Sequence, residues 1–224
     1  GETPDEITGA AKVMREKAEK INLSDLYTVD TCGTGGDGAN TYNISTATAV
    51  IVAAAGAYVT KHGNRAVTSK SGSADVLEAL GVNINLTPEQ VEKCIREEKI
   101  GFMFAPNFHK AMKYAIGVRR ELGFRTIFNI LGPLTNPAKS NAQVLGVFNP
   151  DMTELMAEAL KNLGTEHALV VHGMDGLDKF TLTDKTKVTE LKNGEIKTYY
   201  VEPEDFGLTS CVKKELLGGD ASEN

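Results

Sequence analysis

The alternation of apolar and polar positions predicts helices and strands in turn along the chain. Between residues 4 and 20, apolar side chains recur every three or four residues, which is typical of an amphipathic helix. Residues 27–31, YTVDT, and 57–61, AYVTK, predict strands, and the apolar stretch 45–55 between them predicts a buried helix. A strand, a helix and a strand in this order indicate two parallel neighbours in one sheet.

The same alternation continues toward the end of the chain. The further elements expected are helices at 73–80, 88–98, 107–122 and 152–163, and strands at 126–130, 143–148 and 167–171. Residues 186–201 predict a β-hairpin, because the pair Asn193 and Gly194 suits its two-residue turn. Strands that alternate with helices indicate an α/β fold.

The two helices expected at 88–98 and 107–122 interrupt that alternation. They are amphipathic, and between them only the short apolar stretch 101–105 could form a strand. We therefore expect a central, mostly parallel sheet flanked by helices, together with a small all-α lobe that is discontinuous in sequence. The expected division is a partial helical lobe at 1–26 and 87–122, and an α/β domain at 27–86 and 123–224.

Composition and charge narrow the class of protein. The chain has 224 residues, of which 41% are hydrophobic and 24% charged, as in ordinary globular proteins. A net charge of −6 without a basic tract argues against nucleic-acid binding, and no apolar run reaches the length of a membrane span. Three cysteines without a close pair argue against a disulfide framework or a zinc site. Such a cysteine content is compatible with the reducing conditions of the cytoplasm. Because the sequence starts without methionine and stops at GGDASEN, we expect that both ends are cut.

A glycine-rich loop follows the first expected strand. It reads Gly33-Thr34-Gly35-Gly36-Asp37-Gly38 and leads to Asn43, Ser45 and Thr46 at a helix start. Glycines let the backbone approach a ligand and point N–H groups at it, and a helix N-terminus adds partial positive charge. A turn with a helix cap would need fewer glycines, so the loop favours anion binding. It matches neither the GK[ST] nor the GxGxxG pattern of nucleotide-binding loops.

A second loop, rich in cations and hydroxyls, follows the second expected strand. Its residues are Lys61-His62-Gly63-Asn64-Arg65, and then Ser69-Lys70-Ser71-Gly72-Ser73 just before a helix. Alone, this loop would be interpreted as solvated. Because both loops belong to one parallel unit, they would present two phosphate sites at one edge of the sheet, which suits a substrate with two phosphate groups.

Two further loops are less specific. Residues 132–137, GPLTNP, form a turn with two prolines that we interpret as structural. After the strand expected at 167–171, Asp175 and Asp178 lie in the stretch HGMDGLDK. These carboxylates could bind Mg²⁺, but a solvated acidic turn is equally compatible with the sequence.

Isolated histidines and arginines carry less information. His109 and His167 lie in or beside expected helices, and we interpret them as packing or surface residues. Arg119 lies on the polar side of the helix at 107–122, where the default interpretation is a solvated face. No strong nucleophile pattern is present, so we expect no covalent catalytic residue and favour a reaction driven by binding and charge stabilisation.

Six strings, in chain order, resemble the anthranilate phosphoribosyltransferases of tryptophan biosynthesis: GTGGD, NIST, KHGNR, SGSADVLEALG, RTIFNILGPLTNP and VVHGMDGLD. The resemblance covers nearly the whole chain and implies that the phosphoribosyl group of phosphoribosyl pyrophosphate passes to the amine of anthranilate. Pyrophosphate leaves, and Mg²⁺ is the implied cofactor. Members of this family usually form homodimers. The related pyrimidine nucleoside phosphorylases share the architecture and are the alternative.

The resemblance also implies roles for individual residues. Phosphoribosyl pyrophosphate would be held by Gly33, Thr34, Gly35, Gly36, Asp37, Asn43, Ser45, Thr46, Lys61 and Ser73. Anthranilate would be bound by Gly33, His62, Asn64 and Arg119, with Arg119 facing its carboxylate. Mg²⁺ would be bound by Ser45 and Asp178.

Lys179 departs from the family pattern, which has an Asp-Glu pair that binds metal where this chain has Asp178 and Lys179. Three interpretations remain open. Lys179 neutralises pyrophosphate directly and replaces one Mg²⁺, or Asp175 or Asp184 supplies the missing carboxylate, or the chain is a weakly active or inactive member that only binds ligand.

Overall fold

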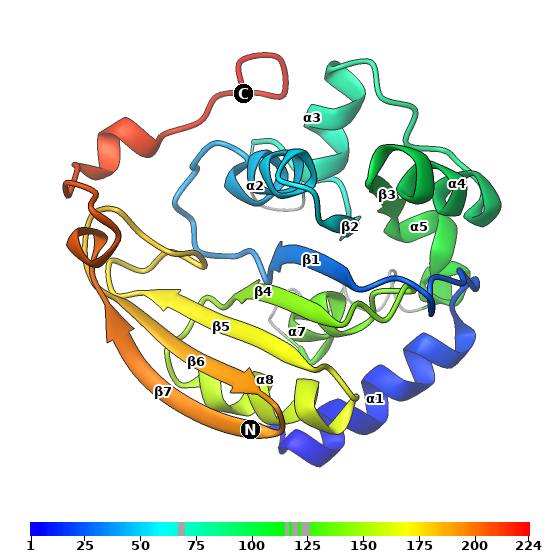
Figure 1. Cartoon of the computed structure of the whole chain (residues 1–224), viewed down its shortest axis with the longest axis horizontal. Coiled ribbons are helices and arrows are strands. Elements are labelled where there is room, and N and C mark those ends of the chain that lie inside the picture. Colours follow the sequence, from blue (N-terminus) through cyan, green and yellow to red (C-terminus); the bar gives the residue numbers. More distant parts are fainter. Residues whose placement is uncertain (67–69, 115–116, 118–120, 122–125) are drawn as a thin grey trace.

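One seven-stranded sheet runs through the middle of the molecule (Figure 1). The structure is a computed structural model that describes residues 1–66, 70–114, 117, 121 and 126–224. The strands are β1 Thr28–Gly33, β2 Tyr58–Gly63, β3 Ile100–Phe104, β4 Ala142–Gly146, β5 His167–Gly173, β6 Thr186–Lys192 and β7 Glu195–Val201. Their spatial order is β3-β2-β1-β4-β5-β6-β7, with β1 to β5 parallel and the hairpin β6–β7 antiparallel. The expected α/β class and mostly parallel sheet are confirmed.

Helices cover both faces of this sheet. The α-helices are α1 Pro4–Lys17, α2 Ile44–Ala54, α3 Ser73–Ala79, α4 Pro88–Glu98, α5 Ala105–Phe108, α7 Phe128–Leu131 and α8 Met152–Asn162. The 3₁₀ helices are η1 Lys110–Met112, η2 Gly132–Leu134, η3 Pro203–Phe206 and η4 Lys213–Leu216. Figure 1 shows α2 over one face, and α1 and α8 over the other. Within the described residues, every helix is too short or too polar to cross a membrane.

Local sequence signals set several of these boundaries. At the start of α1, the backbone N–H of Glu6 donates to Oγ1 of Thr3 at 3.3 Å, and the Glu6 carboxylate accepts the Thr3 N–H at 2.8 Å. Such a reciprocal cap satisfies N–H groups that have no partner within the helix. Between β6 and β7, Asn193 and Gly194 have φ of 53° and 79°, the conformation that a two-residue hairpin turn requires. The predicted hairpin is confirmed.

The main core cluster lies between α8 and the sheet. Met156 and Leu160 of α8 are buried together with Leu145 of β4, Val170 of β5 and Leu191 of β6. Burying an apolar side chain of this size stabilises the fold by roughly 1.5–3 kcal/mol. The cluster therefore forms a rigid base beneath the loops that follow β4 and β5.

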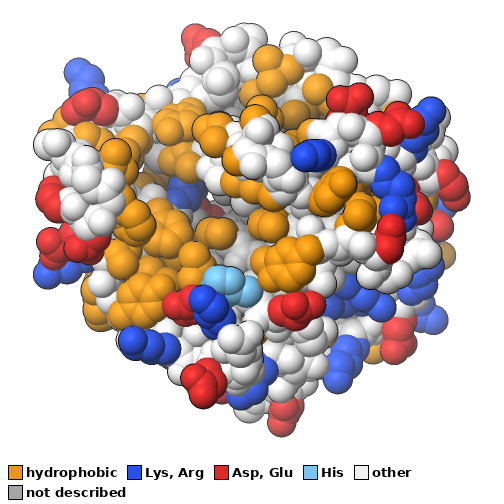
Figure 2. Space-filling model, viewed as in Figure 1, with side chains coloured by type: hydrophobic (Ala, Val, Ile, Leu, Met, Phe, Trp, Pro, Cys, Tyr) orange, Lys and Arg blue, Asp and Glu red, His pale blue; other side chains and the backbone are white. Residues whose placement is uncertain are grey.

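The opposite face of β5 to β7 is more open. Figure 2 shows hydrophobic side chains gathered there. Leu169, Phe180, Val201 and Phe206 help to line a cavity of about 370 Å³ on this side. The rings of Phe180 and Phe206 pack edge to face, with 6.4 Å between their centroids.

The strand expected at 126–130 was wrong, because Phe128–Leu131 forms helix α7. At its start, the N–H of Thr126 donates to Oδ1 of Asn129 at 2.8 Å, and the N–H of Asn129 donates to the Thr126 carbonyl at 2.9 Å. A short apolar run alone does not distinguish a buried strand from a helical turn. These local hydrogen bonds select the helix.

Two packing features involve the elements of the expected helical lobe. The stretch 101–105 mostly belongs to β3, which pairs with β2 and makes the sheet one strand wider. Gly101 permits close packing of α4 on β3, since a Cβ there would lie 2.5 Å from Cγ1 of Ile95. Helix α1 inserts Ile7 and Ala11 into the core cluster of α8. The division into two domains stays a proposal.

The helix expected at 107–122 begins earlier than predicted. Its first part is α5, followed by the 3₁₀ helix η1. Most of its second half lies outside the described residues.

Candidate active site

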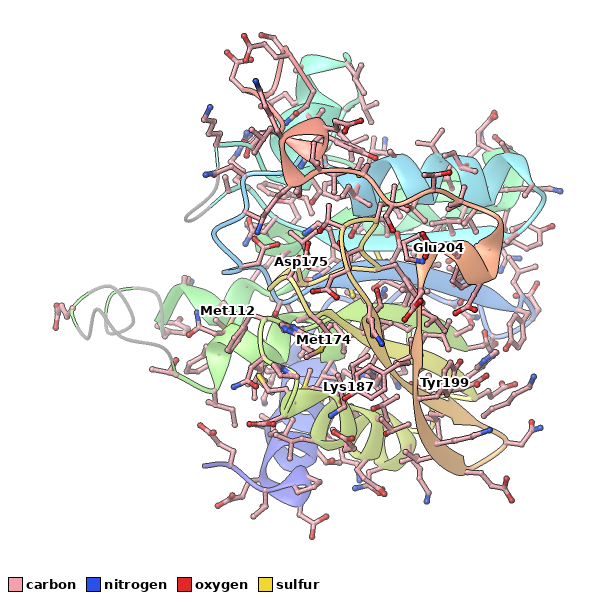
Figure 3. All side chains as sticks on the ribbon, turned by 90° about the vertical axis from the view of Figure 1, so that its left-hand side faces the viewer. Met112, Met174, Asp175, Lys187, Tyr199 and Glu204 are labelled. Atoms are coloured by element: carbon pink, nitrogen blue, oxygen red, sulfur yellow. The ribbon has the colours of Figure 1, made fainter. Side chains whose placement is uncertain are left out.

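The carboxyl ends of β1, β2, β4 and β5 meet at one edge of the sheet, because these strands are parallel neighbours. The loops after β1, β2 and β5 carry the motifs singled out from the sequence. Figure 3 faces this edge and shows Met174 and Asp175 of the loop after β5 near its middle. Ligands of open parallel α/β sheets bind beyond the carboxyl ends of the strands, so this edge is the candidate active site.

The glycine-rich loop after β1 wraps around the carboxylate of Asp178. Gly35, Gly36 and Gly38 have φ of 67°, 78° and 65°, which other residues rarely adopt. At Gly33, an added Cβ would lie 2.5 Å from Oδ2 of Asp178. The N–H of Gly35 donates to the same oxygen at 2.8 Å. Glycine is thus required here both by the backbone and by the approach of Asp178.

The glycine-rich loop is also fixed to the end of β4. The N–H of Thr34 donates to the Gly146 carbonyl at 2.9 Å, and Oγ1 of Thr34 accepts the N–H of Phe148 at 3.2 Å. The predicted substrate residue Thr34 therefore also anchors the loop.

The ammonium of Lys179 lies between two carboxylates. Its Nζ is 3.1 Å from Oδ2 of Asp37 and also donates to Oδ1 of Asp178. The Asp178 side chain is only 4% exposed, and that of Lys179 16%. Asp37 and Asp178 belong to different loops, so Lys179 joins the loop after β1 to the loop after β5.

Burial and this ion pair shift the pKa values of Asp178 and Lys179. Burial raises the pKa of the Asp178 carboxyl, although Lys179 opposes the shift. Burial would lower the pKa of Lys179, but Asp178 and Asp37 outweigh it and raise that pKa above its usual value. Lys179 is therefore a cation at neutral pH.

The two other aspartates proposed as replacement metal ligands are engaged elsewhere. Oδ2 of Asp175 accepts hydrogen bonds from the hydroxyls of Thr181, at 2.9 Å, and Thr183. Asp184 is exposed and accepts the N–H of Lys185 at 2.7 Å. The geometry gives little support to the interpretation that either residue supplies the missing carboxylate.

Lys61 lies deeper than a surface phosphate ligand would. Its side chain is buried, and Nζ donates to the carbonyl of Thr31 at 2.8 Å. Burial lowers its pKa, against the attraction of the fully buried Asp30. Oδ2 of Asp30 accepts Nδ2 of Asn136 at 2.8 Å, which ties the GPLTNP turn to β1. This buried network supports the interpretation of that turn as structural.

The loop after β2 is closed by small residues. A Cβ at Gly63 would lie 2.2 Å from Oγ of Ser73, and this hydroxyl donates to the Asn64 carbonyl at 3.2 Å. Ser73 opens α3, and Asn64 follows β2, so the two predicted ligand residues are in contact.

The charge of Arg65 is directed away from this loop. Its guanidinium pairs with Asp75 at 3.0 Å and with Glu78 at 2.8 Å, both on α3. Arg65 belongs to a loop from which the sequence predicted a phosphate site, but its guanidinium is paired with carboxylates of α3.

The start of α2 faces both loops. Nδ2 of Asn43 donates to the carbonyl of Ser71 at 3.2 Å, which connects the start of α2 with the loop after β2. Ser45 and Thr46 lie on the first turn of this helix, where the partial positive charge of the helix N-terminus favours an anion. The carbonyl of Ser45 accepts a hydrogen bond from Oγ1 of Thr31 at 2.8 Å. This bond uses the backbone of Ser45 and not its side-chain hydroxyl.

His62 and His109 form a buried pair that the sequence did not predict. Their rings pack edge to face with centroids 5.0 Å apart, and among the described residues neither Nε2 has a hydrogen-bond partner. Burial, followed by the neighbouring His109, lowers the pKa of His62 to about 3. Unpaired buried nitrogens of this kind are unusual in proteins, which makes this pair a candidate for contact with a ligand.

His109 was interpreted from the sequence as a packing or surface residue. It follows the carboxyl end of β3 after the short helix α5. Treating 101–105 as a firm strand would have placed His109 at the same edge as the other motifs. Arg119, the residue expected to face the carboxylate of anthranilate, lies outside the described residues.

A parallel α/β sheet with glycine-rich loops and a helix start at its carboxyl edge is typical of α/β proteins that bind phosphate groups. The model of the glycosyl transferase family, a/b domain, matches residues 26–224, and the chain belongs to this family.

Several known proteins are similar to this chain. It is 63% identical over 224 residues to the anthranilate phosphoribosyltransferase of Acetivibrio thermocellus, covering 100% of this chain and 65% of the relative. The structure of the enzyme of that name from Thermus thermophilus matches with a TM-score of 0.93 and 46% identity, covering 100% and 66% of the two chains. The Saccharomyces cerevisiae enzyme in complex with PRPP and Mg matches with a TM-score of 0.90 and 32% identity, covering 99% and 61%. The chain thus spans less than two thirds of these proteins.

Proposed function

We propose that this protein transfers the phosphoribosyl group of phosphoribosyl pyrophosphate to the amine of anthranilate and releases pyrophosphate, a step of tryptophan biosynthesis. The observation that carries the proposal is 63% identity, over every residue of this chain, to a relative named for that reaction. We further propose the cytoplasm as its location and a homodimer as its assembly, as is usual in the family.

The chain's own residues would hold the two phosphate-bearing ends of the donor. The N–H groups of the glycine-rich loop and the start of α2 suit anions. The proposed ligands are Gly33, Thr34, Gly35, Gly36, Asp37, Asn43, Ser45, Thr46, Lys61 and Ser73. Lys61 would act mainly through its charge, because its ammonium is hydrogen bonded to Thr31. Donors preorganised around the leaving pyrophosphate stabilise the charge that develops there.

The acceptor would lie near His62 and Asn64, with Gly33 and Arg119 completing its site. Because the pKa of His62 is lowered to about 3, its imidazole is neutral at pH 7 and can face an aromatic ring or accept a hydrogen bond. The amine of anthranilate is already neutral and carries a lone pair. Positioning that amine against the ribose therefore supplies much of the catalysis, without a strong base.

Mg²⁺, when bound, would neutralise part of the charge of the diphosphate. Mg²⁺ is commonly held by one or two carboxylates together with substrate phosphates and waters. Ser45 fits this role, because it lies half-buried on the first turn of α2 beside the glycine-rich loop. Asp178 fits it poorly, because Gly35 and Lys179 already engage its two oxygens.

Consumption of anthranilate tests the proposal. Adding phosphoribosyl pyrophosphate and Mg²⁺ is expected to remove anthranilate fluorescence and to release one pyrophosphate for each anthranilate consumed. Phosphate-dependent cleavage of uridine or thymidine without this reaction would instead select a nucleoside phosphorylase. Binding of phosphoribosyl pyrophosphate without either turnover would select a family member that only binds ligand.

A further inference from the structure

All four carboxylate oxygens of Asp37 and Asp178 are engaged by N–H donors. Lys179 takes one oxygen of each residue. The second oxygen of Asp178 accepts the N–H of Gly35 at 2.8 Å, and that of Asp37 accepts the N–H of Ala39 at 3.1 Å. Each of these four oxygens therefore already has an N–H donor, and the ammonium of Lys179 lies between the two carboxylates.

This arrangement does not fit a divalent cation at the same pair. Mg²⁺ needs several oxygen ligands at about 2.0–2.1 Å in near-octahedral geometry. It would have to displace Lys179, which is adjacent to Asp178 in the chain, or lie beside it as a like charge. Within the described residues, no cluster of three or more His, Cys, Asp or Glu side chains could hold a metal ion.

We propose that Lys179 is a built-in cation of the active-site edge, which occupies the place between Asp37 and Asp178 and keeps divalent metal away from this pair. The three charges sum to one net negative charge, whereas a carboxylate at 179 would leave three. The loops after β1 and β5 are thereby joined without metal.

Within the part of the chain that the structure describes, the same ammonium has one N–H group without a partner. A lysine ammonium has three N–H groups, and Asp37 and Asp178 use two of them. Its side chain is half-buried, with 16% of its surface exposed to solvent, beside the glycine-rich loop. This second part of the inference, that the third N–H donates to a diphosphate oxygen, rests on the proposed function.

Manganese titration tests the first part without substrate. Free Mn²⁺ is followed by electron paramagnetic resonance as the ion is added to the unaltered chain, Lys179→Gln, Asp178→Asn and the double variant. We expect the unaltered chain and Asp178→Asn to bind Mn²⁺ equally. Lys179→Gln should gain binding at least tenfold tighter, and the double variant should lose that gain.

Two results of this titration would overturn the inference. One is an unchanged Mn²⁺ affinity in folded Lys179→Gln. The other is a tenfold loss of affinity caused by Asp178→Asn alone, which would show that Asp178 already binds metal. If Lys179→Gln does not fold, the comparison of the unaltered chain with Asp178→Asn still decides whether Asp178 binds metal.

Pyrophosphate binding in the presence of a chelator tests the second part. Calorimetry should show inorganic pyrophosphate binding to the unaltered chain at least tenfold more tightly than to Lys179→Gln. Lys185→Gln is the matched control, because Lys185 is exposed and pairs with Glu202 at 3.0 Å. Equal binding by all three chains would contradict the role of Lys179. Absence of pyrophosphate binding even with Mg²⁺ would instead count against the proposed function. The manganese titration would still decide whether Lys179 keeps divalent metal away from Asp37 and Asp178.

Discussion

At the scale of single residues, burial controls the charge of the histidine beside the proposed acceptor site. His62 is 8% exposed, and its Nε2 has no hydrogen-bond partner among the described residues. Its ordinary pKa of 6.5 is lowered to about 3 by burial and by the nearby His109. The side chain is thus neutral in the folded protein and remains so through mildly acidic conditions.

This shift predicts a loss of stability in acid. His62 binds a proton near pH 6.5 in the unfolded chain, but only near pH 3 in the folded chain. Its contribution to the free energy of unfolding is therefore fully present above pH 6.5 and is lost as the pH falls from 6.5 to 3. At pH 5, His62 should account for about 2 kcal/mol of that loss. Denaturant unfolding of the unaltered chain and His62→Gln, at pH 7.5 and pH 5, measures it. The same loss in both chains would assign it to other groups.

The glycine at the end of β1 gives a second prediction at this scale. In Gly33→Ala the new Cβ would lie 2.5 Å from Oδ2 of Asp178, so the loop after β5 must shift. Forcing an extra methyl into a packed position costs about 1–3 kcal/mol. Gly132→Ala is the control, because a Cβ there meets nothing within 4 Å. Equal melting temperatures for the two variants would contradict the close approach of Asp178.

The sequence predicted the glycine-rich loop at this scale because its glycine density exceeds what a turn needs. It did not predict the partners of Lys61 and Arg65, which depend on how strands and α3 pack. Nor did it predict that the ring of His109 packs against the ring of His62.

At the scale of elements, α1 packs into the core cluster of α8. Ile7 is fully buried in the cluster that contains Met156 and Leu160 of α8. Ile7→Ala should therefore lower the free energy of unfolding by about 2–4 kcal/mol. Val13, on the same helix, is 55% exposed, and Val13→Ala should change the stability by less than about 0.5 kcal/mol. Chemical denaturation compares them, and equal small effects would mean that α1 is not docked on α8.

Most elements could be predicted because their periodicity and caps agree. The reciprocal cap of α1, the buried run of β5 and the turn at Asn193 and Gly194 are local signals. Two of the failures have one cause: a short apolar run can form a strand or a helical turn. Hydrogen bonds at Thr126 select a helix for one run, and pairing with β2 selects a strand for the stretch that forms β3.

At the scale of the whole molecule, the strand order decides which motifs meet. β1 lies between β2 and β4, and β5 follows β4, so loops more than 130 residues apart in the sequence converge at one edge. The hydrogen bond between Gly35 and Asp178, 143 residues apart, is the direct sign of this convergence. Sequence alone predicted a shared edge but not which side chains would touch across it.

The property proposed above all for this edge of the sheet is the binding of phosphoribosyl pyrophosphate. The most direct measurement is a calorimetric titration of that compound, with Mg²⁺, into the unaltered chain, Gly33→Ala and Gly132→Ala. We predict binding by the unaltered chain and Gly132→Ala, and at least tenfold weaker binding by folded Gly33→Ala. Absence of binding at millimolar concentration, or equal binding by all three chains, would contradict the account.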